Sequence, residues 1–303
     1  MVKNLVDEIK KLKKEKNAII LAHYYQPPEI QDIADVIGDS YYLSEVARDR
    51  KEKVIVICGV RFMAESAKIL SPEKIVLMPA PDSGCAMADM ACEKEIIKLK
   101  EKYKDAYTVC YINTTAKVKS HCDVAVTSSS ALSILENVEN KQIIFLPDKN
   151  LGGYIAEHLP DKKFIFWDGY CKYHNDIKVE DIINLKNEHK DAKVLVHPEC
   201  TKEVRELGDY IGSTSQIIEF ATQSDTNDFI IATEEGILHE LSKKNPQKRF
   251  FIPGGSICCK DMKKTNLENL YDTLLNMKNE VTLDNEISKS ALRCLENMHS
   301  LAK

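Results

Sequence analysis

Short hydrophobic runs alternate with amphipathic segments along the chain, and this alternation predicts strands and helices in turn. Val54–Val60 is a continuous apolar run between charged residues, which is typical of a strand buried on both faces of a parallel sheet. Phe62–Leu70 follows with helical spacing of its apolar residues and stops at Ser71-Pro72. Strands that alternate with helices form parallel sheets covered on both faces, so the pattern predicts an α/β fold.

The same criteria predict the remaining elements. The other expected strands are Asn17–Ala22, Asp32–Ile37, Lys74–Met78, Tyr107–Ile112, Asp123–Val126, Gln142–Leu146, Lys163–Trp167, Lys193–Val196, Tyr210–Ile211, Asp228–Ile231 and Arg249–Ile252. The other expected helices are Val2–Lys16, Tyr41–Arg50, Glu93–Tyr103, Ala131–Val138, Gly153–His158, Val179–His189, Gln216–Thr222, Ile237–Ser242, Asn266–Lys278 and Asp284–Leu301.

The pattern occurs three times with a period of 86 to 88 residues. In each copy a strand leads to a polar cluster, a short strand leads to a Gly, Ser or Thr turn, and a last strand leads to a cysteine. The clusters begin at His23, Tyr111 and His197, which are 88 and 86 residues apart. The cysteines are Cys85, Cys171 and Cys259, which are 86 and 88 residues apart.

Three copies of one α/β unit predict three short parallel sheets. We expect units at residues 1–87, 88–173 and 174–262, and closing helices over residues 263–303 that pack back on the core. Small units bury a low fraction of their surface, so the three should pack tightly against each other. In such sheets ligands bind beyond the carboxyl ends of the strands, where all these landmarks lie. The repeat therefore predicts pseudo-symmetric units around one central cavity.

Composition and charge narrow the class of protein. With 44% hydrophobic and 29% charged residues, the 303-residue chain has the composition of a globular protein in water. A net charge of −5 without a basic stripe argues against nucleic acid as a partner. No apolar stretch approaches the roughly 18 residues of a membrane span, and the lysine-rich start lacks the apolar centre of a secretion signal. We expect a cytoplasmic protein whose ten cysteines stay reduced.

Two kinds of polar feature are candidates for chemistry. The turns Gly38-Asp39-Ser40, Thr127-Ser128-Ser129 and Gly212-Ser213-Thr214 precede helices, where free N–H groups favour anions, although the same residues are ordinary helix caps. The clusters pair alternate residues, which share one face at a strand end: His23 with Tyr25, Tyr111 with Asn113, and His197 with Glu199. Such pairs suit general acid–base catalysis, and contacts with neighbouring loops are the simpler interpretation.

The cysteines divide into three groups. Cys85, Cys171 and Cys259 are equivalent in the repeat, although the adjacent Cys258 competes with Cys259. Packing in the core is expected for Cys58, Cys110 and Cys294, while Cys92, Cys122 and Cys200 stay further candidates. Three thiolates suit a 4Fe–4S cluster with one open iron, a Lewis acid for a substrate oxygen. Zinc stays open as well, because His174 offers a fourth ligand beside Cys171.

Six motifs stand out in order along the chain: His23-Tyr24-Tyr25-Gln26, Gly38-Asp39-Ser40, Pro147-Asp148-Lys149-Asn150-Leu151-Gly152, His197-Pro198-Glu199-Cys200, Gly212-Ser213-Thr214 and Met262-Lys263. Together they resemble the motifs of the quinolinate synthase family, the A protein of NAD biosynthesis. The resemblance implies three pseudo-symmetric three-layer α/β/α domains around a central 4Fe–4S cluster. It implies a transferase that condenses iminoaspartate with dihydroxyacetone phosphate to quinolinate, phosphate and two waters. An L-aspartate oxidase or an aspartate dehydrogenase is the implied source of iminoaspartate.

The resemblance also implies roles for individual residues. The cluster ligands would be Cys85, Cys171 and Cys259, the last because it stands three residues before the Met262-Lys263 pair. The substrate would contact His23, Ser40, Tyr111, Asn113, Ser128, His197, Glu199, Ser213 and Thr214. Tyr25 and Glu199 would transfer protons, assisted by His23 and His197. The segment Pro79–Ala91, rich in small residues, is a candidate mobile cover.

Three other classes of protein stay in competition. A zinc-dependent hydrolase or lyase would use the Cys and His ligands. A non-catalytic protein that binds small anions would use the three turns, with cysteines that only pack. A redox-sensing regulator with a labile cluster would need a partner surface that the sequence does not indicate.

Overall fold

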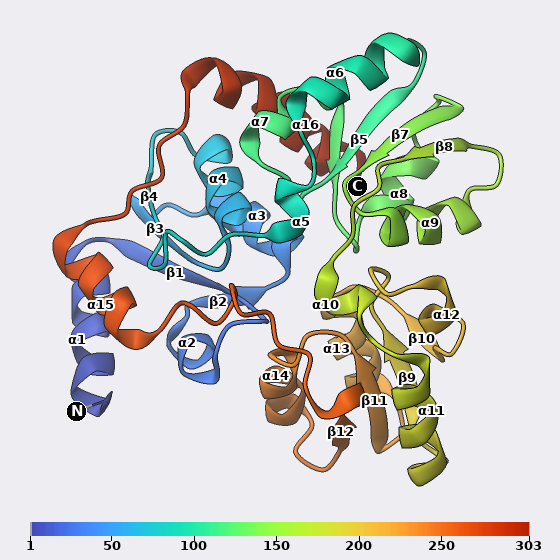
Figure 1. Cartoon of the computed structure of the whole chain (residues 1–303). Coiled ribbons are helices and arrows are strands. Elements are labelled where there is room, and N and C mark those ends of the chain that lie inside the picture. The colour runs from blue at the N-terminus through green and yellow to red at the C-terminus, as the bar shows by residue number, and fades with distance from the viewer. Residues whose placement is uncertain (1, 303) are drawn as a thin grey trace.

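The computed structural model describes residues 2–302, so the terminal residues of the predicted units, Met1 and Lys303, lie outside it. It contains three parallel four-stranded sheets with one common strand order: β2-β1-β3-β4, β6-β5-β7-β8 and β10-β9-β11-β12. The strands are β1 Ala18–His23, β2 Val36–Gly38, β3 Val54–Cys58, β4 Ile75–Leu77, β5 Tyr107–Tyr111, β6 Val124–Val126, β7 Gln142–Leu146, β8 Lys163–Phe166, β9 Lys193–Val196, β10 Tyr210–Ile211, β11 Asp228–Ala232 and β12 Arg249–Phe251. The predicted α/β class and its three parallel sheets are confirmed (Figure 1).

Helices connect the strands and cover the sheets. The longer ones are α1 Val2–Glu15, α3 Ser40–Asp49, α4 Arg61–Leu70, α6 Glu93–Lys102, α8 Ala131–Glu136, α9 Lys149–His158, α11 Val179–Glu188, α13 Thr214–Gln223, α14 Ile237–Lys244, α15 Leu267–Asn276 and α16 Asn285–Leu301. The short ones are α2 Pro28–Ile33, α5 Ala86–Asp89, α7 Ala116–Lys119, α10 Lys172–Asn175, α12 Lys202–Arg205 and the 3-10 turn η1 Pro253–Gly255. No helix within residues 2–302 is both long and apolar enough to cross a membrane.

The three sheets share local contacts as well as strand order. In each unit an aspartate just before the second strand along the chain (β2, β6 or β10) accepts a hydrogen bond of 2.8 Å. The donor is a backbone N–H of the preceding strand (β1, β5 or β9). The pairs are Asp35 with Ile20, Asp123 with Thr108, and Asp209 with Val194. These aspartates are 88 and 86 residues apart, which is the spacing of the sequence repeat. The repeat is therefore structural, although most side chains differ between copies.

The structure corrects several element boundaries. Helix α9 begins at Lys149 and not at Gly153, because the Asp148 side chain accepts from the N–H groups of Asn150 and Leu151 and so caps an earlier start. The sequence pattern does not predict α2, α5, α7, α10 and α12, which have only four to six residues. A helix of one turn shows no clear 3.6-residue periodicity, so hydrophobic pattern alone misses it.

The two C-terminal helices pack on elements of the first two sheets' units. Helix α15 packs on α1, and α16 packs along β6 and α7 of the second unit and α4 of the first, so it bridges the two units (Figure 1). Cys294 of α16 is fully buried, as expected for a core residue. The carboxyl ends of all three sheets are directed toward the middle of the molecule (Figure 1). This arrangement determines where a shared site can form.

Candidate active site

One cavity lies where the three sheets meet, with about 970 Å³ of space not filled by protein atoms, its open mouth included. The predicted site residues that line it are His23, Tyr25, Ser40, Cys85, Tyr111, Asn113, Ser128, Cys171, His197, Glu199, Thr214 and Cys259. The lining therefore draws on all three units, which the sequence repeat predicts.

Ser213 is the one predicted site residue outside the lining. It is fully buried and caps α13, accepting a hydrogen bond from the N–H of Gln216, whose side chain bonds back to the Ser213 N–H. The next residue, Thr214, lines the cavity as the first residue of this helix. Ser213 therefore shapes the turn, and the helix-cap interpretation holds for its side chain.

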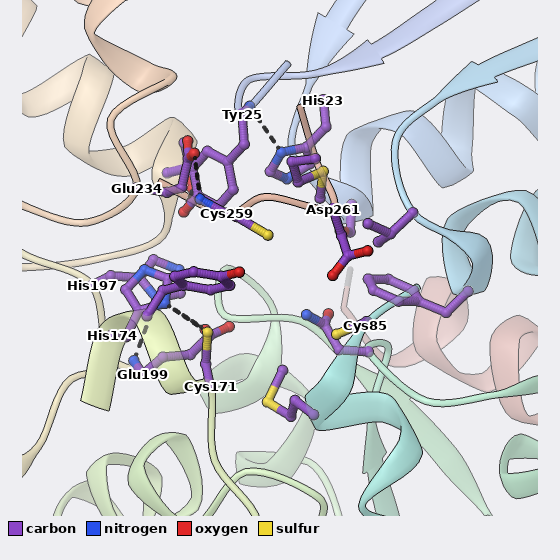
Figure 2. Close-up of a pocket in the computed structure, with 18 of the residues that line it drawn as sticks. His23, Tyr25, Cys85, Cys171, His174, His197, Glu199, Glu234, Cys259 and Asp261 are labelled. Atoms are coloured by element: carbon purple, nitrogen blue, oxygen red, sulfur yellow. Dashed lines mark hydrogen bonds and ion pairs between the residues drawn. The ribbon is translucent and has the colours of Figure 1, made fainter. Parts of the chain in front are cut away.

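Three thiols enter the cavity from equivalent loops. Figure 2 shows the side chains of Cys85, Cys171 and Cys259 directed toward the same space. Burial raises the pKa of Cys85 to about 12 and that of Cys259 to about 11, and it raises the pKa of Cys171 well above its usual value. Buried thiols of this kind stay protonated unless a bound cation stabilises the thiolates.

The other seven cysteines lie outside the lining of the cavity as residues 2–302 form it. Cys258 is half-buried, and Cys92 is exposed. Cys58 is buried in a strand, and Cys110 and Cys294 are buried together with a sulfur–sulfur distance of 3.6 Å. Cys122 and Cys200 are also buried, and the Cys200 thiol donates to the carbonyl oxygen of Ala232. The packing predictions for Cys58, Cys110 and Cys294 are confirmed.

Two buried acids accept hydrogen bonds from the backbone N–H groups of two of the three cysteines. The N–H of Cys171 donates to Asp148 at 3.2 Å, and the N–H of Cys259 donates to Glu234 at 3.0 Å. Burial, with Glu199 nearby, raises the pKa of Asp148 to about 8, and burial also raises that of Glu234. Asp148 and Glu234 are 86 residues apart, which is the spacing of the repeat. The repeat could therefore have predicted both acids as site residues, although the sequence analysis did not use it for them.

Two histidines present the same tautomer to the cavity. The Nδ1 atom of His23 accepts from the N–H of Tyr25 at 3.1 Å, and that of His197 accepts from the N–H of Glu199 at 3.3 Å. Burial lowers the pKa of each to about 3, so both rings are neutral near pH 7. A neutral ring that accepts at Nδ1 carries its proton on Nε2, so each of these histidines has an Nε2–H group to donate.

A buried hydrogen-bonded chain joins Tyr25 to Glu199. The Tyr25 hydroxyl lies 2.8 Å from that of Thr233, which lies 2.9 Å from Nε2 of His174. The Nδ1 atom of His174 lies 2.8 Å from one Glu199 oxygen, and the Tyr111 hydroxyl donates to the other at 2.5 Å. Figure 2 shows His174, Glu199 and Cys171 grouped on one side of the cavity.

The surroundings of this hydrogen-bonded chain give its two ends, Tyr25 and Glu199, different protonation states. Burial, with Glu199 nearby, raises the pKa of Tyr25 well above 10, so its hydroxyl keeps its proton. Burial alone would raise the pKa of Glu199, but His174 and the Tyr111 hydrogen bond outweigh it and hold the pKa well below its usual range. The site therefore pairs a buried proton donor with a buried carboxylate.

Several groups in the site can bind a ligand or a metal. The side-chain oxygen of Asn113 is buried without a hydrogen-bond partner among the described residues, so it can accept from a ligand. Ligand atoms of Cys171, His174 and Glu199 lie within 4.8 Å of one another and form a group able to hold a metal ion. Sequence reasoning considered His174 only as a zinc ligand and missed Thr233, because its partners are 59 and 208 residues away.

The fold and the cavity define an α/β protein with a buried small-molecule site that three repeated units share. The chain belongs to the quinolinate synthetase A protein family, whose model matches residues 7–300. It is 71% identical to the quinolinate synthase of Clostridioides difficile strain 630 over the full length of both chains. It is 56% identical to that of Clostridium perfringens strain 13, over 97% of this chain and 98% of the relative. It is 50% identical to that of Caldicellulosiruptor saccharolyticus, over 99% of both.

Proposed function

We propose that this protein is a quinolinate synthase, a transferase of de novo NAD biosynthesis. It condenses iminoaspartate with dihydroxyacetone phosphate and releases quinolinate, phosphate and two waters. The observation that carries the proposal is that one cavity is lined by residues of all three units in a chain of this family. Iminoaspartate would come from an L-aspartate oxidase or an aspartate dehydrogenase, and the reaction would take place in the cytoplasm.

A 4Fe–4S cluster held by Cys85, Cys171 and Cys259 is the cofactor that we propose. The donor set supports it, because three free thiols from equivalent loops face one space and soft thiolates favour such clusters. When bound, a cluster with three cysteine ligands supplies one open iron as a Lewis acid for a substrate oxygen. Asp148 and Glu234 orient two of the ligand loops through backbone N–H groups.

The substrate's anionic groups would lie at the three polar turns. Ser40 and Thr214 are the first residues of α3 and α13, where unpaired backbone N–H groups and the helix dipole favour anions. Ser128 follows β6 at the equivalent position of the second unit and also lines the cavity. Carboxylates and a phosphate are the groups that such turns bind, and both substrates carry them. Ser213 supports this arrangement as the cap of α13.

Proton transfer would run between Tyr25 and Glu199. The ionised Glu199 is suited to accept a proton from substrate carbon or nitrogen, and the protonated Tyr25 is suited to donate one to a leaving hydroxyl. His23 and His197 would donate hydrogen bonds from Nε2 to substrate oxygens, since both are neutral with an occupied Nδ1. Tyr111 and Asn113 would orient the substrate from the second unit.

The decisive experiment is to measure iron, acid-labile sulfide and quinolinate formation with anaerobically purified protein. About four irons and four sulfides per chain, together with turnover, are expected. Cys85→Ala should lose both cluster and turnover and still fold, whereas Cys92→Ser should keep both, because Cys92 is exposed and does not line the cavity. Full activity of Cys85→Ala would refute the ligand role.

A zinc-dependent hydrolase or lyase is the second candidate, and one observation favours it. Cys171, His174 and Glu199 come close enough to hold a single metal ion. Zinc without sulfide, and no quinolinate formation, would support this function over the proposed one. Tight dicarboxylate binding without metal or turnover, even after anaerobic reconstitution, would instead identify a protein that only binds small anions.

A further inference from the structure

A buried polar side chain occupies the same position in all three units, although its residue type differs each time. Gln31 of α2, Lys119 of α7 and Arg205 of α12 are 88 and 86 residues apart, and their exposed fractions are 1%, 0% and 4%. Each lies on the short helix that follows the polar cluster of its unit. Burying a cation or an amide is costly unless it is hydrogen-bonded, so the recurrence calls for a physical reason.

Each of these side chains donates to the turn that carries the site residues of its own unit. The acceptor five residues earlier is the carbonyl oxygen of Gln26 for Gln31, of Thr114 for Lys119 and of Cys200 for Arg205. Gln31 also donates to the carbonyl seven residues earlier, that of Tyr24, at 2.9 Å, and Lys119 to that of Ile112 at 2.7 Å. These carbonyls flank Tyr25 and Asn113 directly, and Cys200 follows Glu199.

The same side chains also reach into a neighbouring unit. Gln31 donates to the carbonyl of Gly236 at 2.9 Å, and Arg205 donates to the carbonyl of Asn150 at 3.3 Å. The Lys119 ammonium lies 5.6 Å from the centre of the Phe62 ring. The contacted residues Phe62, Asn150 and Gly236 are themselves 88 and 86 residues apart. The first unit thus contacts the third, the second contacts the first, and the third contacts the second.

We propose that Gln31, Lys119 and Arg205 are positioning residues for the site, each fixing one site turn to its own short helix and to a neighbouring unit. The inference rests on the proposed function, since it assumes that the three turns act on one substrate. Loss of the Gln31 or Lys119 donor frees the backbone carbonyls on both sides of a site residue, and loss of Arg205 frees the carbonyl that follows Glu199. In each case the turn can then shift. A misplacement of about 1 Å can lower the rate about 100-fold.

Lys119→Met tests the proposal, because methionine has nearly the length of lysine and lacks the donor. We expect kcat/KM for quinolinate formation to fall at least about tenfold at a temperature where the variant is fully folded, with a raised KM. Amide hydrogen exchange over residues 111–116 should become about tenfold faster, while residues 23–27 and 197–201 keep their protection. Lys119→Arg, which restores a cationic donor, should recover most of kcat/KM.

Lys74→Met is the matched control. Lys74 is also buried, and its ammonium donates to three backbone carbonyls, those of Ala47, Arg48 and Arg50, at the end of the sheet away from the cavity. This variant should lose stability and keep kcat/KM within about twofold of the wild type. If both variants lower kcat/KM alike, or if Lys119→Met leaves it unchanged, the positioning role is wrong.

Two further measurements keep the outcomes distinct. If Lys119→Met does not fold, Gln31→Met is tested in the same way, with the change in exchange expected at residues 23–27. If the wild-type protein forms no quinolinate, the proposed function fails. Exchange then decides the positioning inference alone: faster exchange confined to the turn of the altered unit supports it, and unchanged or general exchange overturns it.

Discussion

The hydroxyl of Thr233 gives the sharpest test of the buried chain between Tyr25 and Glu199. Thr233 is fully buried, and its hydroxyl lies between the Tyr25 hydroxyl at 2.8 Å and Nε2 of His174 at 2.9 Å. Thr233→Val replaces this hydroxyl with a methyl group of similar size, so it creates no cavity. Tyr25 keeps its second partner, the Thr214 hydroxyl at 2.9 Å, but Nε2 of His174 is left without its partner.

The expected cost follows from that one unpaired atom. A buried polar group that loses its hydrogen-bond partner costs about 1–3 kcal/mol, so the free energy of unfolding should fall by about that amount. Thr108→Val is the matched control, because Thr108 is equally buried and its hydroxyl has no hydrogen-bond partner among the described residues. Removing an unpaired buried hydroxyl relieves a desolvation penalty, so the control should be neutral or stabilising.

Equilibrium unfolding in urea measures both variants against the wild type. Circular dichroism reports the helices and fluorescence reports Trp167, and coincident transitions justify a two-state free energy. A loss below about 0.5 kcal/mol for Thr233→Val, or an equal loss for both variants, would contradict the hydrogen-bonded chain, since the free energy of a paired hydroxyl must differ from that of an unpaired one.

Three further predictions concern pH, packing and capping. His197 has a pKa of about 3 in the folded state against about 6.5 unfolded, so its contribution to stability is lost as pH falls through this window. Between pH 4 and 6, the free energy of unfolding of His197→Gln should therefore change with pH less steeply than that of the wild type, by about 1.4 kcal/mol per pH unit. Urea midpoints that change in parallel for the two proteins over this range would contradict the prediction. Gly169→Ala should cost about 1–3 kcal/mol in thermal or urea unfolding, because the new Cβ would lie 2.5 Å from the carbonyl oxygen of Pro147. Gly153→Ala, inside α9 with its nearest atom at 4.0 Å, should instead stabilise by about 0.5–1 kcal/mol. Asp148→Ala removes the cap of α9 and should cost about 1–2 kcal/mol, which the same unfolding assay measures.

Hydrophobic pattern predicted most strands well because they are continuous apolar runs with charged or turn residues at their ends. The predicted strand Asp32–Ile37 is wrong at its start, because α2 extends to Ile33 and β2 begins at Val36. Gln142–Leu146, Lys193–Val196 and Tyr210–Ile211 match their predicted bounds in full, and most others differ by one or two residues. The run from Val54 was predicted to reach Val60 but ends as a strand at Cys58, because the apolar residues continue into the start of α4. The prediction that this run is buried is correct, and only the predicted strand conformation of residues 59–60 is wrong.

Adjacent residues in loops were beyond the reach of sequence pattern. Cys258 and Cys259 are the same residue type in a loop without periodicity, so no pattern shows which side chain faces the site. The family resemblance alone favoured Cys259 as the cluster ligand. In the structure the N–H of Cys259 donates to Glu234, and its side chain lines the cavity while that of Cys258 does not. The role of either residue as a ligand stays a prediction, as do the unit boundaries and the mobility of Pro79–Ala91.

The sequence by itself determined the α/β class, the threefold period and the set of equivalent loop ends, because these depend on local apolar periodicity and spacing. Only the tertiary structure decided how these ends meet. The contacts of Tyr25 with Thr233 and of Arg205 with Asn150 join residues 208 and 55 positions apart, and in each pair the two residues belong to different units. Such contacts form when units pack and exclude water, and no pattern within one unit encodes the partner in another.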